Sequence, residues 1–178
     1  MLPKEKEVVL KRAQKVFFKA MLAGYFGDGS DTTKTKTADG ETIITYVSID
    51  GDFRVVDRYY TRPDSDCSAG TTTIFYQNLP TWWMSYSGEY PADIIPFLKE
   101  AVGSNYQKGI FNLGRGPSEY RNGDLHYHCR SNNPGTNNTF DCFSGQEVVV
   151  RFEINKETGL RTIVKGLGFH RFIGMSLI

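Results

Sequence analysis

The sequence predicts an α+β fold in which two equivalent helices pack against antiparallel sheet. Two segments carry apolar residues at three- and four-residue spacing, as amphipathic helices do. Short runs of β-branched and aromatic residues follow each of them, separated by Gly, Asp and Asn turns, as in antiparallel sheets. The 12 Phe, 10 Tyr and 18 Gly among the 178 residues also favour sheets and tight turns over a helical bundle.

The first predicted helix covers residues 4–23. Its apolar side chains recur along one face, while Lys and Glu fill the other. Pro3 suits the first helical turn, and Gly24 suits the left-handed position that ends a helix. The following stretch, Phe26–Gly40, is rich in Gly, Asp, Ser, Thr and Lys without apolar periodicity, and we expect a long loop there.

Four strands are predicted in the first half of the chain and three in the second. They cover Thr42–Ile49, Phe53–Tyr60, Thr71–Tyr76, Thr81–Tyr86, Asp124–Arg130, Glu147–Glu153 and Leu160–Lys165. A second helix is expected over Pro91–Val102, with Gly103 as its stop, and Pro96 shifts its expected start towards Ile95. We interpret Asn112–Asn122 as a loop.

The two halves of the chain, residues 1–90 and 91–178, are predicted to be repeats of one unit. Matching segments occur in the same order in both halves. The pairs are Val16–Ala20 with Phe97–Ala101, Gly51–Phe53 with Gly123–Leu125, Ser68–Thr71 with Phe143–Gln146, and Met84–Gly88 with Val164–Gly168. Each unit is marginal as an independent core, so we expect both to pack as one compact unit about a pseudo-twofold axis, with a ligand cleft at the seam.

Charge and cysteine content argue against several classes of protein. The 21 Lys and Arg nearly balance the 20 Asp and Glu, and the basic residues are spread out, so nucleic acid is not expected as the main partner. No apolar run approaches the roughly 18 residues of a membrane span, and Lys11 and Arg12 interrupt the apolar stretch near the N-terminus. Neither membrane insertion nor secretion is therefore predicted. Three cysteines favour reduced thiols in a cytoplasm, and no cofactor is predicted.

The densest aromatic cluster combines Trp82, Trp83 and Tyr86 with Tyr59. On a strand, Trp82 and Tyr86 share one face with Met84, and Trp83 takes the other. One interpretation is an ordinary sheet core. The other is an aromatic-lined pocket with Trp83 as a stacking platform, because Tyr and Trp keep a polar tip that suits a half-wet cleft.

Asp57 places a carboxyl group on a strand that otherwise has a buried composition. Burying this group requires a partner, and Arg58 cannot be that partner because neighbouring strand residues face opposite sides. The carboxyl group is either a structural hydrogen-bond anchor or a ligand contact.

His126 and His128 alternate on a predicted strand, so both rings lie on one face, about 7 Å apart. A metal ion could bridge that distance, but zinc sites usually bring more ligands in tighter patterns. We therefore interpret the two histidines as a solvated pair or as hydrogen-bonding residues of a cleft, and no metal is predicted.

Gly114-Arg115-Gly116 is a Gly-rich turn whose arginine either lies on the surface or grips an anion. Together with the nearby Tyr120, this arginine is assigned to the lining of the predicted cleft. Motifs of nucleophilic catalysis are lacking, since no Gly-x-Ser-x-Gly occurs and a Cys/His pair would need residues from distant parts of the chain.

One set of motifs is divided between the two halves. The second half has Gly114–Ser118, Tyr120, Gly123-Asp124 and Phe143–Glu147, and the first has Gly51-Asp52, Asp57–Tyr59, Gly70 and Trp82–Gly88. At these residues the chain resembles the family DUF5680, whose pattern includes a Tyr-x-x-Gly-Asp strand, a Phe-x-Gly-x-Glu turn and a Trp-x-Met-x-Tyr-x-Gly strand. The resemblance implies two divergent tandem copies of a bacterial domain that often forms the C-terminal part of XRE-type helix-turn-helix regulators. It implies no activity.

The leading hypothesis is a non-enzymatic binding module that holds a small-molecule ligand in an aromatic-lined cleft between the two repeats. The expected lining residues are Asp57, Tyr59, Trp82, Trp83, Tyr86, Arg115, Tyr120, His126 and His128. Two alternatives stay open. One is a hydrolase or lyase whose acid and base groups are Asp57, Asp124 or the two histidines. The other is a protein-interaction or inhibitor protein whose exposed aromatics dock on a partner.

Overall fold

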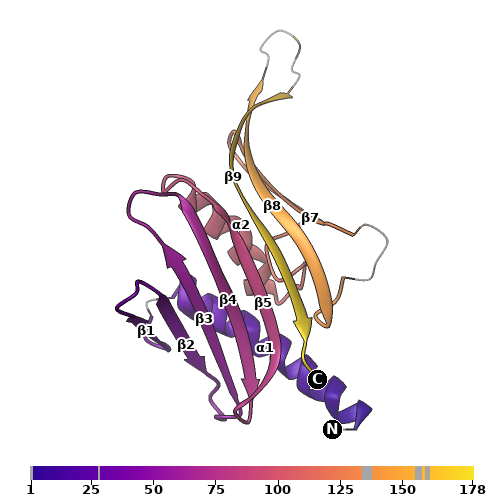
Figure 1. Cartoon of the computed structure of the whole chain (residues 1–178). Helices are drawn as coiled ribbons and strands as arrows, with labels where there is room; N and C mark the ends of the chain where they lie inside the picture. Colours follow the sequence, from indigo (N-terminus) through magenta and orange to yellow (C-terminus); the bar gives the residue numbers. More distant parts are fainter. Residues whose placement is uncertain (1, 28, 134–137, 155–157, 159–160) are drawn as a thin grey trace.

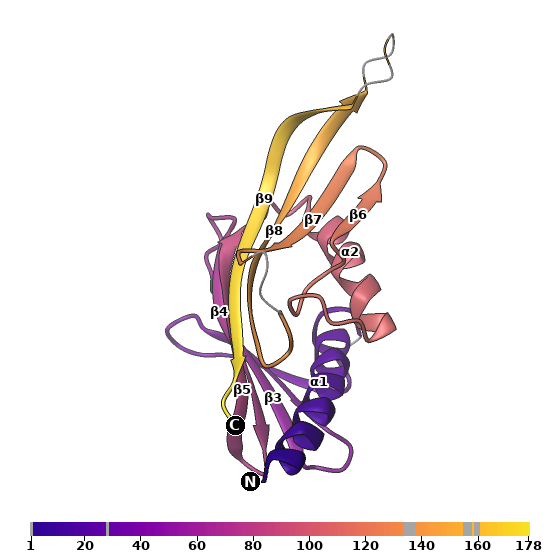
Figure 2. The ribbon, with the colours of Figure 1, turned by 90° about the vertical axis from the view of Figure 1, so that its right-hand side faces the viewer.

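The computed structural model describes residues 2–27, 29–133, 138–154, 158 and 161–178. In this part of the chain, two helices pack on a single antiparallel sheet of nine strands. The α+β class is therefore confirmed. The strands are β1 (Thr32–Lys36), β2 (Thr42–Val47), β3 (Phe53–Thr61), β4 (Cys67–Tyr76), β5 (Leu79–Glu89), β6 (Glu119–Asn122), β7 (Leu125–Ser131), β8 (Cys142–Ile154) and β9 (Arg161–Ser176). Their order across the sheet is β1-β2-β3-β4-β5-β9-β8-β7-β6. The helices α1 (Pro3–Tyr25) and α2 (Ile95–Lys108) lie on the same face of the sheet (Figures 1 and 2).

The predicted first helix is confirmed as α1, and its apolar stripe packs on the sheet. The buried side chains of this stripe include Val9, Leu10, Ala13, Phe17 and Met21. The helix continues two residues past its predicted end, because Gly24 stays helical and the turn closes at Gly27, whose N–H donates to Leu22 O at 2.8 Å. This extension brings the hydroxyl of Tyr25 to the inner side of the sheet.

Two predicted loops contain short strands, so the loop predictions are wrong at these places. β1 lies within Phe26–Gly40 and pairs with β2, where Lys34 stands opposite Ile44. β6 lies within Asn112–Asn122 and pairs with β7. Both are edge strands with polar side chains, so they lack the apolar alternation by which a strand is recognised.

The second helix begins at Ile95, as Pro96 suggests, but it does not stop at Gly103. Gly103 lies inside α2, where an added Cβ would come within 2.6 Å of the Phe26 ring. The glycine therefore allows the end of α1 to approach α2 closely. The helix ends at Lys108 and is capped by Gly109, which has the left-handed φ of 64° that favours glycine.

β5 and β9 pair in the middle of the sheet, where the two halves of the chain meet. Trp82 lies opposite Ser176, and Gly88 lies opposite His170. β8 and β9 are longer than predicted, and their far ends form a hairpin that extends beyond the rest of the sheet (Figure 1). The boundary at residues 90/91 falls in the connection between β5 and α2. Two repeated units about a pseudo-twofold axis remain a prediction.

The core lies between the helices and the sheet and is centred on Trp82. This side chain is fully buried, and its ring stacks on Phe140 with the two ring centroids 4.7 Å apart. Its Nε1–H donates to the carbonyl oxygen of Phe140 at 2.7 Å. Trp83 lies on the opposite face of β5 and is half-buried, as strand alternation predicts. The described residues contain no helix that is both long and apolar enough to cross a membrane.

Candidate functional site

A cavity of about 320 Å³ lies between the helices and the helix-facing side of the sheet. Leu98 and Val102 of α2 form part of its apolar wall, and Arg115 enters it from the loop between α2 and β6. Lys34 of β1 and Lys99 of α2 also line it. This volume is within the range of about 300–1,000 Å³ that is typical of small-molecule sites.

Asp57 lies at the bottom of this cavity and accepts hydrogen bonds from three hydroxyl groups. Thr72, its register partner on β4, donates at 2.7 Å, and Tyr86 of β5 donates at 3.1 Å to each carboxylate oxygen. Tyr25 donates from the end of α1. Burial raises the pKa of Asp57 above its ordinary value, although the three hydroxyl groups and the charge of Arg115 act in the opposite direction. The partner that burial of Asp57 requires is thus a set of hydroxyls.

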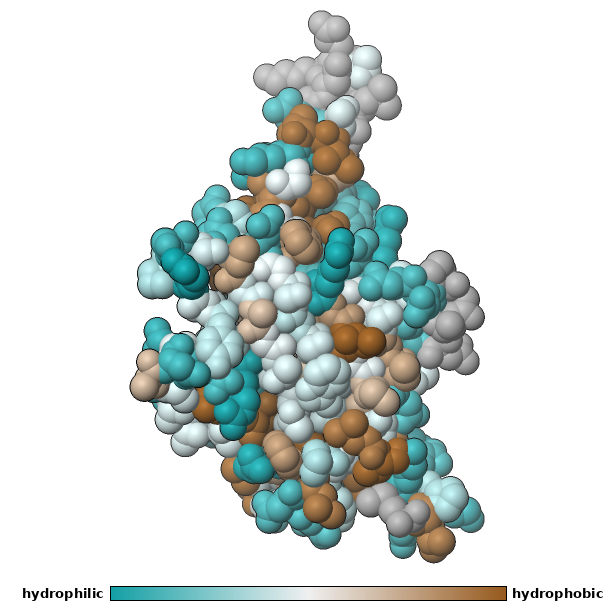
Figure 3. Space-filling view, in the orientation of Figure 1, coloured by the Kyte–Doolittle hydropathy of each residue, from teal (hydrophilic) through white to brown (hydrophobic). Residues whose placement is uncertain are grey.

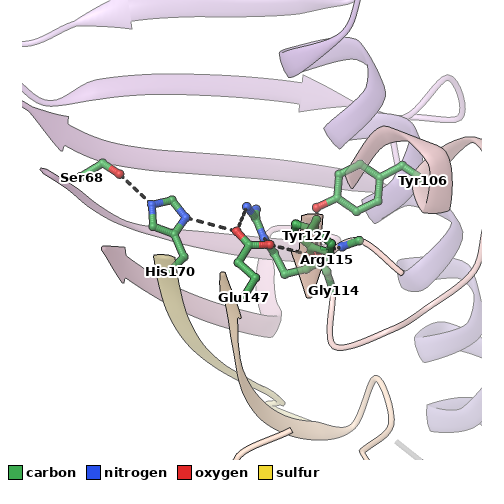
Figure 4. Close-up of polar contacts among 8 residues, drawn as sticks. Ser68, Tyr106, Gly114, Arg115, Tyr127, Glu147 and His170 are labelled. Carbon is green, nitrogen blue, oxygen red and sulfur yellow. Dashed lines mark hydrogen bonds and ion pairs between the residues drawn. The ribbon is translucent and has the colours of Figure 1, made fainter. Parts of the chain in front are cut away.

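Ser68, Gly88, His170 and Glu147 form one row across four neighbouring strands. Ser68 is opposite Gly88, Gly88 is opposite His170, and His170 is opposite Glu147. Because Gly88 has no side chain, Ser68 Oγ reaches across it to His170 Nε2 at 3.0 Å. On the other side of the ring, His170 Nδ1 lies 3.5 Å from Glu147 Oε1. The result is a continuous Ser–His–Glu chain (Figure 4).

Replacing Gly88 with alanine is expected to lower the free energy of unfolding by about 1–3 kcal/mol, as overpacking typically does. A Cβ at this position would lie 1.9 Å from the Phe169 carbonyl oxygen and 2.6 Å from a ring carbon of His170. Urea unfolding measures the change. The matched control is Gly166→Ala on β9, where no atom lies within 4 Å of an added Cβ. Equal stability of the two variants would contradict the close approach.

Glu147 is fully buried and paired with Arg115. The Arg115 Nε and Nη2 atoms donate to its two carboxylate oxygens at 3.0 and 2.5 Å, and Tyr127 Oη donates at 2.6 Å. Burial by itself would raise the pKa of Glu147, but the charge of Arg115 and the contact with His170 outweigh it and lower the pKa to about 2. Glu147 is therefore ionised at neutral pH.

The loop that carries Arg115 is held so that the guanidinium group points inward. Leu113 and Gly114 have left-handed φ values of 56° and 68°. The Gly114 carbonyl oxygen accepts a hydrogen bond from Tyr106 Oη at 2.8 Å, and the Arg115 carbonyl oxygen accepts one from Asn105 at 3.3 Å. Interpretation of this Gly-rich segment as a surface turn is therefore wrong, because the arginine side chain is only 15% exposed.

Four of the nine residues predicted to line a ligand site meet in the 320 Å³ cavity. These are Asp57, Tyr59, Tyr86 and Arg115. The first three lie on β3 and β5, and the last on the loop after α2. They come from both halves of the sequence.

The other aromatic residues of that prediction lie elsewhere. Trp82 belongs to the core below the cavity, and Trp83 faces away from the helices. Tyr120 lies on β6, where its hydroxyl donates to Glu100 Oε1 at 2.5 Å. These positions separate a structural aromatic core from the aromatic lining of the cavity.

His126 and His128 share one face of β7, as predicted, with ring centroids 5.6 Å apart. They alternate with Tyr127, whose side chain points to Glu147, so the two rings lie on the side of the sheet away from the cavity. His126 packs on Phe152 at 4.5 Å between ring centroids. Within the described residues, no group of three or more His, Cys, Asp or Glu side chains is arranged to hold a metal ion.

Sequence reasoning missed five residues, of which four line the cavity and Glu147 lies behind His170. They are Tyr25, Ser68, Thr72, Glu147 and His170. The signal that could have found two of them is the spacing of polar residues along predicted strands, since Thr72 and Glu147 occupy inward positions where an apolar residue is expected. Ser68 lies before the predicted start of its strand at Thr71. The contact between Ser68 and His170 spans 102 sequence positions, and only the strand register reveals it.

A second hollow, of about 810 Å³, lies on the face of the sheet that is turned away from the helices. Figure 3 shows this face, whose centre is of intermediate hydropathy. The charged residues that line the hollow, Glu41, Arg58 and Arg171, are not buried. Because charges in water discriminate poorly between ligands, the smaller cavity, which is lined by the buried carboxylate of Asp57, is the better candidate site.

Comparison with known proteins identifies the family of the chain. No curated protein and no solved structure matches it. Residues 57–158, more than half of the chain, match the family described as Domain of unknown function (DUF5680). The match runs from β3 to β8 and so covers Asp57, Ser68, Arg115 and Glu147, although His170 lies beyond it. The chain belongs to the DUF5680 family.

Proposed function

We propose that this protein binds a small organic molecule in the cavity between its helices and its sheet. The observation that carries the proposal is the combination of an apolar wall with ionisable groups at the bottom of one 320 Å³ space. Asp57 and His170 are almost fully buried there, being 2% and 8% exposed. Such convergent polar groups in an apolar cavity are the usual features of a ligand site.

The charges around the cavity favour a ligand that carries an acidic group. Lys34 and Lys99 line the cavity from opposite layers, and both side chains are exposed. Deeper in the cavity, the charge of Arg115 is paired with Glu147. A carboxylate or phosphate near the lysines would gain from their charge, while the remainder of the ligand would contact Leu98, Val102 and Tyr59.

We also infer that the cavity lies at a seam between two duplicated units. In the first half, Gly70 lies under the hydroxyl of Tyr86, and in the second, Gly145 lies under the ring of Phe172. Met84–Gly88 pairs with His170–Gly174 across the middle of the sheet. His170–Gly174 is therefore a better counterpart of Met84–Gly88 in the second unit than Val164–Gly168 is. A twofold axis between β5 and β9 would relate these pairs.

A thermal-shift screen tests the binding function. The panel contains small carboxylates, phosphate, nucleotides, cyclic dinucleotides, sugars and amino acids. A ligand at about one hundred times its dissociation constant adds about 2.7 kcal/mol, which corresponds to a rise of about 5–10 °C in Tm at this chain length. Acidic compounds are expected to give the shift.

Tyr59 and Tyr60 provide a matched pair of variants for this screen. Tyr59 lines the cavity, whereas its neighbour Tyr60 lies on the other face of β3 and lines the outer hollow. Tyr59→Ala is expected to reduce the ligand-induced shift, and Tyr60→Ala to retain it. A flat response across the panel, or a shift that both variants retain, would refute binding in this cavity.

A further inference from the structure

We propose that Ser68, His170 and Glu147 form a catalytic triad that hydrolyses an ester or thioester of a small acid. The proposal rests on the binding function above, because the cavity has to hold the acyl substrate. It assigns the roles of nucleophile to Ser68, general base to His170 and orienting carboxylate to Glu147. These are the roles of the Ser–His–carboxylate arrangement that recurs on unrelated folds.

The contacts along the row suit each group to the role it is assigned. Glu147 is ionised, and its Oε1 lies 3.5 Å from His170 Nδ1, so its negative charge favours the tautomer with the ring proton on Nδ1. In that tautomer His170 Nε2 is an acceptor, and Ser68 Oγ–H, at 3.0 Å, donates to it. In this tautomer the imidazole is ready to take the serine proton.

The surroundings hold the imidazole in place. Its ring lies between Tyr90 and Tyr86, with centroid distances of 4.9 and 5.9 Å. Behind it, the Glu147 carboxylate is fixed by Arg115 and Tyr127. A base whose orientation is fixed before the substrate arrives needs little rearrangement during the reaction.

The nucleophile is accessible, unlike the two groups behind it. Ser68 is partly exposed and lines the cavity near the beginning of β4, whereas His170 is 8% exposed and Glu147 fully buried. A purely structural hydrogen bond needs no access to solvent. Exposure thus increases from Glu147 through His170 to Ser68, so that a substrate in the cavity can reach the serine while the two groups behind it stay buried.

The chemistry needs only the acyl compound and water. His170 Nε2 takes the Ser68 proton as Oγ bonds to the acyl carbon, and the leaving alcohol or thiol departs with that proton. Water then gives a proton to Nε2, its oxygen bonds to the acyl carbon, and Ser68 Oγ leaves and recovers the proton. The products are the free acid and the alcohol or thiol, and nothing is oxidised or reduced.

The test is covalent labelling of the whole protein with a fluorophosphonate, in which Ser68 Oγ bonds to phosphorus and fluoride leaves. Intact mass and peptide mapping are expected to show one adduct, on Ser68. His170→Asn is expected to slow labelling by about 100-fold or more, because a general base is lost. Ser87→Ala is the matched control and is expected to label normally, since Ser87 is exposed on the other face of β5.

Wild-type protein that acquires no adduct on Ser68, or a His170→Asn variant that labels at the wild-type rate, would overturn the triad. Thermal unfolding of each variant shows that it is folded. The thermal-shift screen, repeated on Ser68→Ala, separates the two proposals. If the ligand still raises Tm while Ser68 of the wild type is not labelled, binding in the cavity stands and catalysis by the triad is refuted. Hydrolysis of short-chain p-nitrophenyl esters by the wild type, lost in Ser68→Ala, supports the triad.

Discussion

Replacing Arg115 with methionine is expected to lower the free energy of unfolding by about 3–5 kcal/mol, the usual effect of removing one partner of a buried ion pair. The variant leaves Glu147 fully buried without the two hydrogen bonds that Arg115 donates at 3.0 and 2.5 Å. Methionine keeps most of the side-chain volume, so the loss reports the charge rather than a cavity. Urea unfolding at pH 7, followed by fluorescence, measures it.

The pH dependence of this loss has a defined sign. Arg115 holds the pKa of Glu147 below its ordinary value, at about 2, so the stabilisation is present above the ordinary carboxyl pKa and disappears as the pH falls towards 2. The difference between wild type and Arg115→Met should therefore shrink on acidification. The control is Arg62→Met, which breaks an exposed pair with Asp64 at 2.7 Å and is expected to change little. Similar effects of the two substitutions would contradict the buried pair.

Trp82→Ala is expected to destabilise the protein by about 3–5 kcal/mol, because a large aromatic side chain leaves a cavity in a packed core. The ring is fully buried, stacks on Phe140 and lies near Phe17, with centroid distances of 4.7 and 5.3 Å. Its loss also leaves the Phe140 carbonyl oxygen without the hydrogen bond from Nε1. Chemical denaturation measures the change.

Trp83→Ala is the comparison for this experiment, since the neighbouring tryptophan is half-buried on the opposite face. We expect it to destabilise the protein clearly less than Trp82→Ala. The chain has two tryptophans, so each variant also isolates the fluorescence of the other. Emission from Trp82 alone should be blue-shifted relative to that from Trp83 alone, because Trp82 has no contact with water. An equal cost of the two substitutions would contradict the assignment of Trp82 to the core.

Local patterns predicted the elements whose own side chains contribute to the core. α1 and the strands β2 to β5 carry clear apolar periodicity, and their existence follows from sequence alone. β1 and β6 carry none, because an edge strand with polar side chains is held by backbone pairing with its neighbour. Gly103 was predicted to end the second helix, but the structure shows that a glycine is needed there because the Phe26 ring packs closely against this position.

The candidate site was only partly predictable, for a geometric reason. Asp57 was predicted as a site residue because it is a charged residue on a strand of otherwise buried composition, and Arg115 because it lies in a Gly-rich turn. Both line the cavity. Ser68 and His170 lie outside the predicted strands, and nothing local connects them to Glu147. The three side chains meet only because their strands are adjacent in a fixed register. A shift of one position would turn all three side chains to the other face.

The central pairing of β5 with β9 has a consequence for the order of folding. β5 (residues 79–89) can pair with β4 early, because the two strands are adjacent in sequence. Its other edge can pair only with β9 (residues 161–176), which is synthesised much later. Such non-local pairing slows folding through the loop that must be closed first. Until it happens, the row from Ser68 to Glu147 is interrupted and the β5 edge is open to other strands. We therefore expect slow refolding, and an association of partly synthesised chains through the β5 edge, as consequences of this topology.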